Sequence, residues 1–178
     1  MKTIEPLLIA PQVFGDERGY FFEPYNAKRF LEKCDIQTSF VQDNESLSKR
    51  GVLRGLHYQL EPHAQAKLVR VVTGSVLDIC VDIRKSSPHF KKVYAFTLDD
   101  KKKDLLFVPR GFAHGFVVLS ESAIFQYKVD NYWSKEHERG ILYNDPTLKI
   151  DWMLDPSTLL ISDKDKILPR FDAATYFD

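Results

Sequence analysis

Between residues 52 and 132 the chain is a succession of short strand-like runs, and this feature constrains the fold most. Seven apolar or alternating runs follow one another, at residues 52–60, 66–73, 75–83, 92–98, 104–109, 115–119 and 122–132. Turn signals such as Thr73-Gly74-Ser75 and Ser86-Ser87-Pro88 separate them. Aromatic residues, which favour strands, make up 13% of the chain. This spacing predicts a β-sandwich or a β-barrel.

The run at 75–83 alternates most strictly. Its even-numbered face carries two acidic residues among apolar ones, while its odd-numbered face is wholly apolar. The even face consists of Val76, Asp78, Cys80 and Asp82, and the odd face includes Leu77, Ile79, Val81 and Ile83. If both faces are covered, the aspartates line a polar interior such as a barrel cavity. An exposed sheet face is the alternative.

Helices are expected at two places outside this region. Residues 26–34 form one candidate, with Asn26 as the cap and with Phe30 and Leu31 as an apolar stripe. A second, short helix is expected after Ser162, because Ser162 followed by Asp165 forms a capping pattern. With 178 residues and no repeat, low-complexity segment or linker, residues 1–178 are expected to form a single domain.

Charge and cysteine usage exclude several classes of protein. Lys plus Arg and Asp plus Glu both number 25, so no net charge steers the chain to nucleic acid or to an anionic membrane. The first six residues lack the features of a signal peptide, and no run approaches the ~18 apolar residues of a membrane helix. We therefore expect a cytoplasmic protein. Cys34 and Cys80 are far apart and are expected to be buried free thiols.

One motif points to chemistry on a carbonyl compound. The motif is Arg54-Gly55-Leu56-His57-Tyr58-Gln59, and Lys67 follows ten residues after its histidine. A histidine and a lysine on neighbouring strands place a proton acceptor beside a fixed positive charge. That pair suits reactions at a carbon next to a carbonyl group.

A second motif, Pro109-Arg110-Gly111-Phe112-Ala113-His114-Gly115-Phe116, resembles the second motif of the cupin superfamily, and residues 51–74 occupy the place of the first motif. The resemblance implies an all-β, cupin-type double-stranded β-helix (jelly roll) with a few short helices. Metal-dependent cupins offer two histidines separated by one residue in the first motif, but Gln59 stands where the second would be. His63 falls in a loop. We therefore expect a metal-free site without a cofactor.

The resemblance becomes more specific over nearly the whole chain. Blocks at residues 15–23, 40–44, 52–59, 66–70, 81–88, 111–116 and 127–128 resemble, in order and spacing, successive blocks of the dTDP-4-dehydrorhamnose 3,5-epimerase family. This family makes dTDP-4-keto-L-rhamnose from dTDP-4-keto-6-deoxy-D-glucose. It inverts C3 and C5 without a cofactor.

The resemblance implies a catalytic set of four residues. His57 matches the base, and a base of near-neutral pKa suits protons that the C4 ketone acidifies. Asp165 matches its carboxylate partner, Lys67 the cation that stabilises the enolate, and Tyr127 the acid on the opposite face of the sugar. Without the resemblance, Asp165 would be interpreted as a helix-start residue, Lys67 as solvated surface and Tyr127 as core.

The resemblance also implies the binding residues. Tyr132 matches the platform on which thymine stacks, and Arg54 matches a diphosphate ligand. The other matching positions are Gln42, Asn44 and His114, together with Arg18, Phe21 and Glu23 near the N-terminus, and Lys164 stands where some members place a phosphate-contacting arginine. In this family the N-terminal segment crosses to the partner subunit. This implies a homodimer whose active sites are completed across the interface.

Several alternatives stay open. An epimerase that inverts only C3 or only C5, or a 3,4-ketoisomerase of a related dTDP-4-keto-deoxysugar, would use a similar histidine base. The presence of Tyr127 together with His57, Asp165 and Lys67 favours the double epimerase. A metal-dependent cupin oxygenase or isomerase would need ligands that the sequence does not place. A non-catalytic sugar-nucleotide binding protein would retain Tyr132 and Arg54 but should lose the base or the acid.

Overall fold

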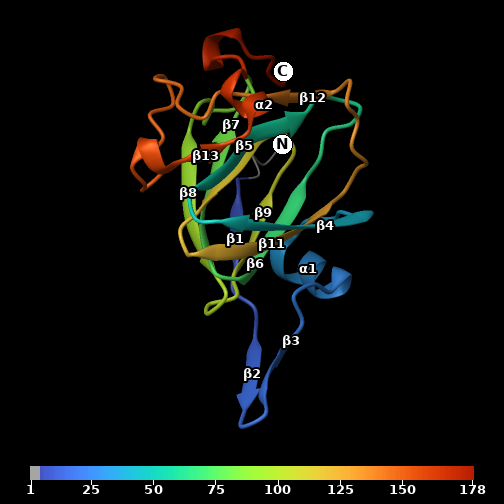
Figure 1. Ribbon diagram of the computed structural model, residues 1–178. Coiled ribbons are helices and arrows are strands. Elements are labelled where there is room, and N and C mark those ends of the chain that lie inside the picture. Colours follow the sequence, from blue (N-terminus) through green and yellow to red (C-terminus); the bar gives the residue numbers. More distant parts are fainter. Residues whose placement is uncertain (1–4) are drawn as a thin grey trace.

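The structure is a computed structural model that describes residues 5–178, and it is built from two facing antiparallel sheets (Figure 1). The first sheet has the order β1 (Leu7–Ile9), β9 (Leu105–Val108), β6 (Lys67–Thr73), β11 (Ser122–Val129) and β4 (Gln42–Lys49). The second has the order β12 (Glu138–Gly140), β5 (Val52–Gln59), β10 (Phe112–Val118), β7 (Ser75–Asp82) and β8 (Val93–Asp99). A short β13 (Leu160–Ile161) joins β5 in parallel. This architecture confirms the all-β, cupin-type prediction.

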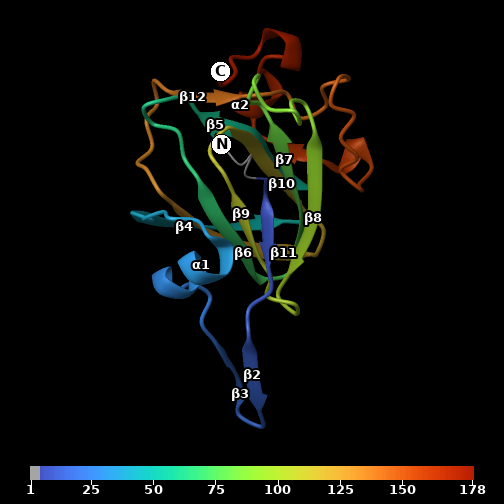
Figure 2. The ribbon, with the colours of Figure 1, turned by 180° about the vertical axis from the view of Figure 1, so that it is seen from behind.

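A third, two-stranded sheet stands apart from the body. The hairpin of β2 (Val13–Asp16) and β3 (Gly19–Phe22) projects away from the barrel, as the two opposite views show (Figures 1 and 2). Its aromatic side chains Phe14, Tyr20 and Phe21 are exposed. Within one chain, this hairpin therefore leaves an apolar surface in contact with solvent.

Strand β7 is covered on both faces, as its alternation allowed. Leu77, Ile79, Val81 and Ile83 pack into a core with Leu53, Trp152 and Phe171 on the outer side of the second sheet. Val76 and Cys80 pack into a separate core between the sheets, with Val69, Leu106 and Phe125. Asp78 and Asp82 are fully buried on this inner face. The exposed-face alternative is therefore wrong.

Both expected helices exist. Helix α1 (Ala27–Cys34) begins after Asn26, whose side chain accepts a hydrogen bond from the Arg29 N–H. Phe30 is buried against Phe107, but Leu31 is 44% exposed, so the predicted stripe contains only Phe30. Helix α2 (Asp163–Lys166) begins after Ser162, whose hydroxyl accepts from the Asp165 N–H as the capping pattern predicts. Two 3₁₀ turns, η1 (Pro156–Thr158) and η2 (Phe171–Ala173), lie nearby in the chain.

All seven predicted strands are present, and five of them agree with the prediction to within one residue at each end, while the other two each differ by three residues at one end. The strand predicted at 115–119 begins at Phe112, because residues from Phe112 onward already pair with Asp82 and its neighbours on β7. The strand predicted at 122–132 ends at Val129, so Tyr132 lies in the following loop. Strand β4 was not predicted, since its residues are almost all polar and lie at the edge of a sheet.

Over residues 5–178 both cysteines are free thiols, as predicted, and Cys80 is buried. Cys34 is only half-buried, so the expectation that it is a buried thiol is wrong. The described helices are all too short or too polar to cross a bilayer. Residues 1–4, which belong to the segment without signal-peptide features, lie outside the described part.

Candidate active site

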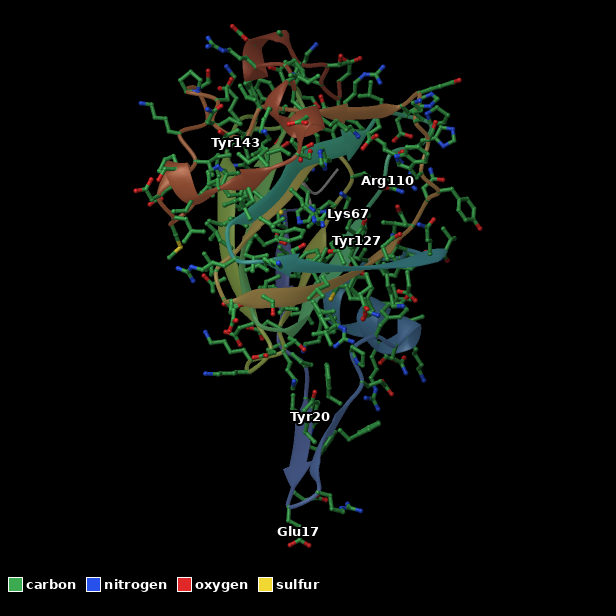
Figure 3. All side chains as sticks on the ribbon, in the orientation of Figure 1. Glu17, Tyr20, Lys67, Arg110, Tyr127 and Tyr143 are labelled. Carbon is green, nitrogen blue, oxygen red and sulfur yellow. The ribbon has the colours of Figure 1, made fainter. Side chains whose placement is uncertain are left out.

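The two sheets enclose a cavity of about 560 Å³ whose lining comes from both walls. Strands β5 and β10, together with α2 and the segment before it, contribute one side, and β4, β6 and β11 contribute the other. Figure 3 shows Lys67 and Tyr127 near each other in the body of the barrel. The lining includes Asn44, Arg54, His57, Lys67, His114, Tyr127, Lys164 and Asp165. The structure therefore brings together eight of the thirteen residues predicted for the site.

A histidine–carboxylate pair lies on one wall. His57 Nε2 is 2.7 Å from Asp165 Oδ1, and the Asp165 side chain is only 4% exposed. The second carboxylate oxygen accepts a hydrogen bond from the Gly55 N–H at 3.3 Å. Burial opposes ionisation of Asp165, but bonding to His57 and Gly55 outweighs it and holds the pKa of this carboxyl below its usual value. The carboxylate is thus fixed in its charged form beside the imidazole.

A second such pair lies deeper on the same wall. His114, which pairs in register with His57 across β10 and β5, has its Nε2 at 2.9 and 3.0 Å from the two carboxylate oxygens of Asp78. Both side chains are buried. The His114 ring is stacked 6.4 Å from the ring of Phe125 on the facing sheet. His114 is therefore fixed on both sides, with little freedom to move.

Lys67 faces these pairs from the other wall. It is the first residue of β6, and its Nζ lies 5.9 Å from the centre of the Tyr127 ring. Burial lowers the pKa of the Lys67 ammonium, and nearby Asp78, Cys80 and Glu138 act in the opposite direction. The cavity thus contains a poorly solvated cation whose nearest acidic neighbours stabilise its charged form.

Tyr127 lies on the same wall as Lys67. It occupies β11, where it pairs with Asn44 of β4. Burial raises the pKa of the Tyr127 phenol, Arg54 opposes this rise, and Glu138 adds to it. The phenol therefore keeps its proton at neutral pH and can donate it.

Several polar side chains at or near the cavity form hydrogen bonds or ion pairs with one another. The Arg54 guanidinium donates to the hydroxyl of Ser48, with both bonds at 3.2 Å. Lys164 Nζ lies 2.7 Å from a carboxylate oxygen of Glu138. The Gln42 amide, which does not line the cavity, donates to Asn44 at 2.7 Å.

The remaining predicted residues lie away from the cavity within one chain. Arg18 and Phe21 belong to the projecting hairpin, where Arg18 pairs with Asp16 and Phe21 is 68% exposed. Figure 3 shows how far this hairpin, marked by Glu17 and Tyr20, extends from the barrel. Glu23 pairs with Arg29. Tyr132 lies in the loop after β11, outside the cavity lining.

Three functional neighbours were missed by the sequence analysis. Asp78 had been noted only as a possible cavity residue, and its contact with His114 depends on strand register. Glu138 faces Lys67, Tyr127 and Lys164 from β12, a three-residue strand without a detectable pattern. Ser48 lies in the polar strand β4 that was not predicted.

One cluster within residues 5–178 has a donor set suited to a metal ion. The ligand atoms of Asp78, Cys80 and His114 lie within 4.8 Å of one another, all buried. The three-histidine arrangement of metal-dependent cupins does not form, because Gln59 stands where the second histidine would be, and its amide bonds to backbone groups. The expectation of a metal-free reaction stays a prediction.

The fold and the site together define a cupin-type enzyme of acid–base chemistry, in which a paired histidine faces a lysine and a tyrosine across the cavity between the sheets. Comparison with known proteins identifies the family. The sequence profile described as dTDP-4-dehydrorhamnose 3,5-epimerase matches residues 2–173.

Individual relatives agree. The chain is 53% identical over 179 residues to dTDP-4-dehydrorhamnose 3,5-epimerase of Shigella flexneri, covering 99% of this chain and 98% of the relative. The crystal structure of the enzyme of that name from Elizabethkingia anophelis superposes with a TM-score of 0.91 at 49% identity, over 97% and 94% of the two chains. The dTDP-6-deoxy-D-glucose-3,5-epimerase of Legionella pneumophila, in complex with dTDP-4-keto-L-rhamnose, has a TM-score of 0.91 at 44% identity, over 97% and 91%. The chain belongs to the dTDP-4-dehydrorhamnose 3,5-epimerase family and is an enzyme of the isomerase class.

Proposed function

We propose that this protein inverts C3 and C5 of dTDP-4-keto-6-deoxy-D-glucose through enolate intermediates, with His57 as the base and Tyr127 as the acid. The observation that carries the proposal is their placement on facing sheets, His57 on β5 and Tyr127 on β11, with both side chains lining one cavity. A sugar ring held between the walls meets the base on one face and the acid on the other. Inversion requires this geometry, because a proton returned from the same face restores the starting configuration.

His57 takes the proton from the carbon next to the C4 ketone. Asp165 holds Nε2, so the other ring nitrogen is the one that accepts the proton. The imidazolium that forms is stabilised by the Asp165 carboxylate, whose lowered pKa keeps it charged. The carbon–hydrogen bond breaks, and its electron pair moves to the C4 oxygen.

Lys67 stabilises the enolate oxygen. Its ammonium lies near the ring of Tyr127 in the cavity and is poorly solvated, so its interaction with a developing negative charge is strong. Tyr127 then gives its phenolic proton to the carbon from the facing wall, and the resulting phenolate regains a proton from solvent. The His57 imidazolium releases its proton to solvent, so both groups return to their starting protonation states and the same cycle serves the second carbon.

The nucleotide extends from the cavity toward its edge. Arg54 and Lys164 line the cavity and supply cations for the diphosphate, while Asn44, held by Gln42, is a polar contact. His114, fixed by Asp78, contacts the sugar. The exposed ring of Tyr132 offers a flat surface for thymine.

We further propose that residues 1–178 form one catalytic domain that works as a cytoplasmic homodimer. The support for a dimer is the exposed aromatic hairpin, since Arg18, Phe21 and Glu23 match binding positions yet do not line the cavity of their own chain. A hairpin inserted into the partner would cover its apolar side chains and complete the partner's site. Cell fractionation and measurement of the mass in solution test the location and the assembly.

Proton exchange tests the proposal. In heavy water, the wild-type protein should incorporate deuterium at C3 and at C5 of dTDP-4-keto-6-deoxy-D-glucose, measured by NMR. His57→Ala should abolish both exchanges while dTDP still binds, because one base serves both carbons. Substantial exchange at either carbon in the variant would mean that a second base exists. Exchange at one carbon only in the wild type would instead favour the C3-only or C5-only epimerase.

A further inference from the structure

The loop after β11 carries Tyr132, whose side chain is 63% exposed. Because few protein side chains pack against this ring, its place is set by the backbone that carries it. A buried side chain, Gln59 of β5, forms hydrogen bonds to that backbone. The Gln59 amide donates from Nε2 to the Tyr132 carbonyl at 3.2 Å, and its Oε1 accepts from the Ser134 N–H at 2.6 Å.

The Gln59 amide also holds a second segment. Nε2 donates to the His63 carbonyl at 2.8 Å, so one amide joins β5, the turn after it and the Tyr132 loop. Both of its donor hydrogens and its acceptor are used on backbone groups. A buried amide with three such bonds fixes geometry strongly, since breaking any of them leaves a polar group unpaired.

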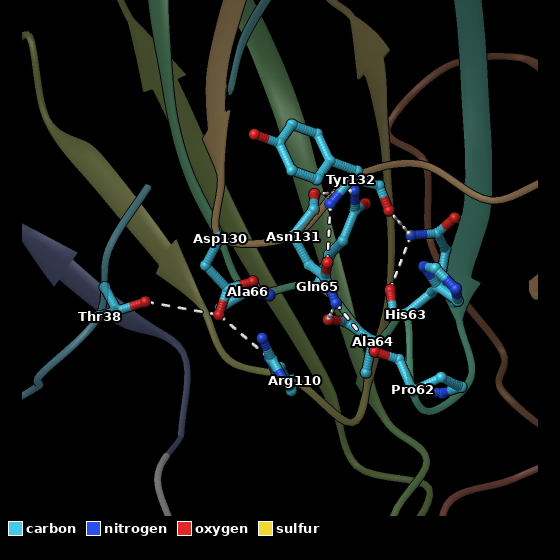
Figure 4. A network of polar contacts seen from close by, with 11 residues as sticks. Thr38, Pro62, His63, Ala64, Gln65, Ala66, Arg110, Asp130, Asn131 and Tyr132 are labelled. Atoms are coloured by element: carbon cyan, nitrogen blue, oxygen red, sulfur yellow. Dashed lines mark hydrogen bonds and ion pairs between the residues drawn. The ribbon is translucent and has the colours of Figure 1, made fainter. Parts of the chain in front are cut away.

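Two neighbouring amides strengthen the same arrangement, as Figure 4 shows. Gln65 donates to the Asn131 carbonyl at 2.7 Å, and Asn131 donates to the Pro62 carbonyl at 3.0 Å. Asn131 Oδ1 also accepts from the Tyr132 N–H at 2.9 Å. The peptide groups on both sides of Tyr132 are thus held by side chains, with Gln59 the link to the strand that carries His57.

We propose that Gln59 is a positioning residue for the nucleotide base, because it holds Tyr132 at a fixed place relative to His57. Gln59 and His57 are two positions apart on β5, and their side chains therefore point to the same side of the strand. The inference rests on the proposed role of Tyr132 as the thymine platform. It assigns to Gln59, at the position where metal-dependent cupins carry a ligand, a role in nucleotide recognition.

The test compares a ligand that has a base with one that lacks it. Gln59→Glu keeps an oxygen for Ser134 but places a carboxylate oxygen against two carbonyls, and Gln59→Met removes all three bonds without adding charge. By calorimetry we expect both variants to bind dTDP about 5- to 100-fold more weakly, the range that loss of base stacking spans. Binding of inorganic pyrophosphate should change less than about twofold. KM should rise while kcat at saturation is retained.

Gln126→Glu is the matched control. Gln126 is a half-buried glutamine on a strand, and its Oε1 accepts from Arg70 Nε at 2.9 Å, so the carboxylate retains that bond. We expect its affinity for dTDP and its KM to equal the wild-type values. A loss of dTDP affinity in this control as large as that in Gln59→Glu would overturn the inference, because the added charge alone would then explain both.

Tyr132→Ala separates the inference from the function on which it rests. If Tyr132→Ala binds dTDP as the wild type does, Tyr132 is not the platform and both proposals about this loop are wrong. If Tyr132→Ala weakens dTDP binding but neither Gln59 variant does, only the positioning role is wrong. In the Tyr132→Ala background, Gln59→Met should have no further effect on dTDP affinity. Additive losses, or an equal loss of pyrophosphate binding, would show that Gln59 acts elsewhere.

Discussion

The Asp165→Asn variant tests the histidine–carboxylate pair, and its effect can be worked out from the structure. Asp165 uses one oxygen for His57 and the other for the Gly55 N–H. An asparagine has one acceptor oxygen and one donor nitrogen, so it cannot accept hydrogen bonds from both partners. The variant also removes the negative charge that faces the imidazolium. The side chain keeps its shape, so packing should be preserved.

The loss of the negative charge determines how far the activation barrier rises. Two unit charges about 4 Å apart attract by ~4 kcal/mol at the effective dielectric constant of ~20 that suits protein sites. With about half of the imidazolium charge developed in the transition state, the barrier rises by ~2 kcal/mol, which slows the reaction ~30-fold. The wrong hydrogen-bond partner at Gly55 or His57 adds to this loss.

Deuterium exchange at C3 under saturating substrate is the assay, with dTDP affinity as a check on the fold. Asp163→Asn is the control, because Asp163 is exposed on the same helix turn and pairs with Lys166. We expect the control to exchange at the wild-type rate. A loss below threefold in Asp165→Asn, with dTDP binding intact, would refute the account of this pair.

Three further predictions concern the cation, the metal and the dimer. Lys67→Arg should move the alkaline loss of activity to higher pH, because burial lowers the pKa of Lys67 and the wild type loses this cation as the pH rises through that pKa. An unchanged pH profile on the alkaline side would mean that another group causes the loss of activity. Dialysis against a strong chelator should leave activity unchanged, and recovery of lost activity by a divalent ion would contradict the metal-free mechanism. After subunit exchange, His57→Ala mixed with Arg18→Ala should recover about one quarter of wild-type sites, since mixed dimers contain one intact site; no recovery would place Arg18 outside the partner's site.

Much of the barrel could be predicted because its central strands alternate. The run at 75–83 placed its apolar residues on the correct faces, and the turn signals separated the strands correctly. Strand β4 could not be predicted this way, because its polar residues form hydrogen bonds at a sheet edge and bury little apolar surface. The end of β11 was placed too late because side-chain amides, rather than strand pairing, hold residues 131–134.

Residues of the candidate site could be predicted only where they belong to a recognisable sequence motif. Nothing local marks Asp165 as a partner of His57, 108 residues away, beyond its place in a capping pattern. Resemblance to the family supplied that pair. The other contacts depend on strand register, which composition does not reveal. They are the contact between Asp78 and His114, the hydrogen bond from Arg54 to Ser48, and the position of Glu138 near Lys67.

The central claim is that base and acid lie on opposite walls of the cavity, and the Tyr127→Phe variant tests it most directly. The change removes the phenolic proton and keeps the ring, so packing should be nearly preserved. Deuterium exchange at C3 and C5 and net inversion are measured in one sample. We predict that inversion falls by about 10²- to 10⁴-fold, the usual contribution of a general acid, while exchange through His57 continues. If exchange and inversion fall by the same factor, Tyr127 is not a separate acid facing His57, and the account is contradicted.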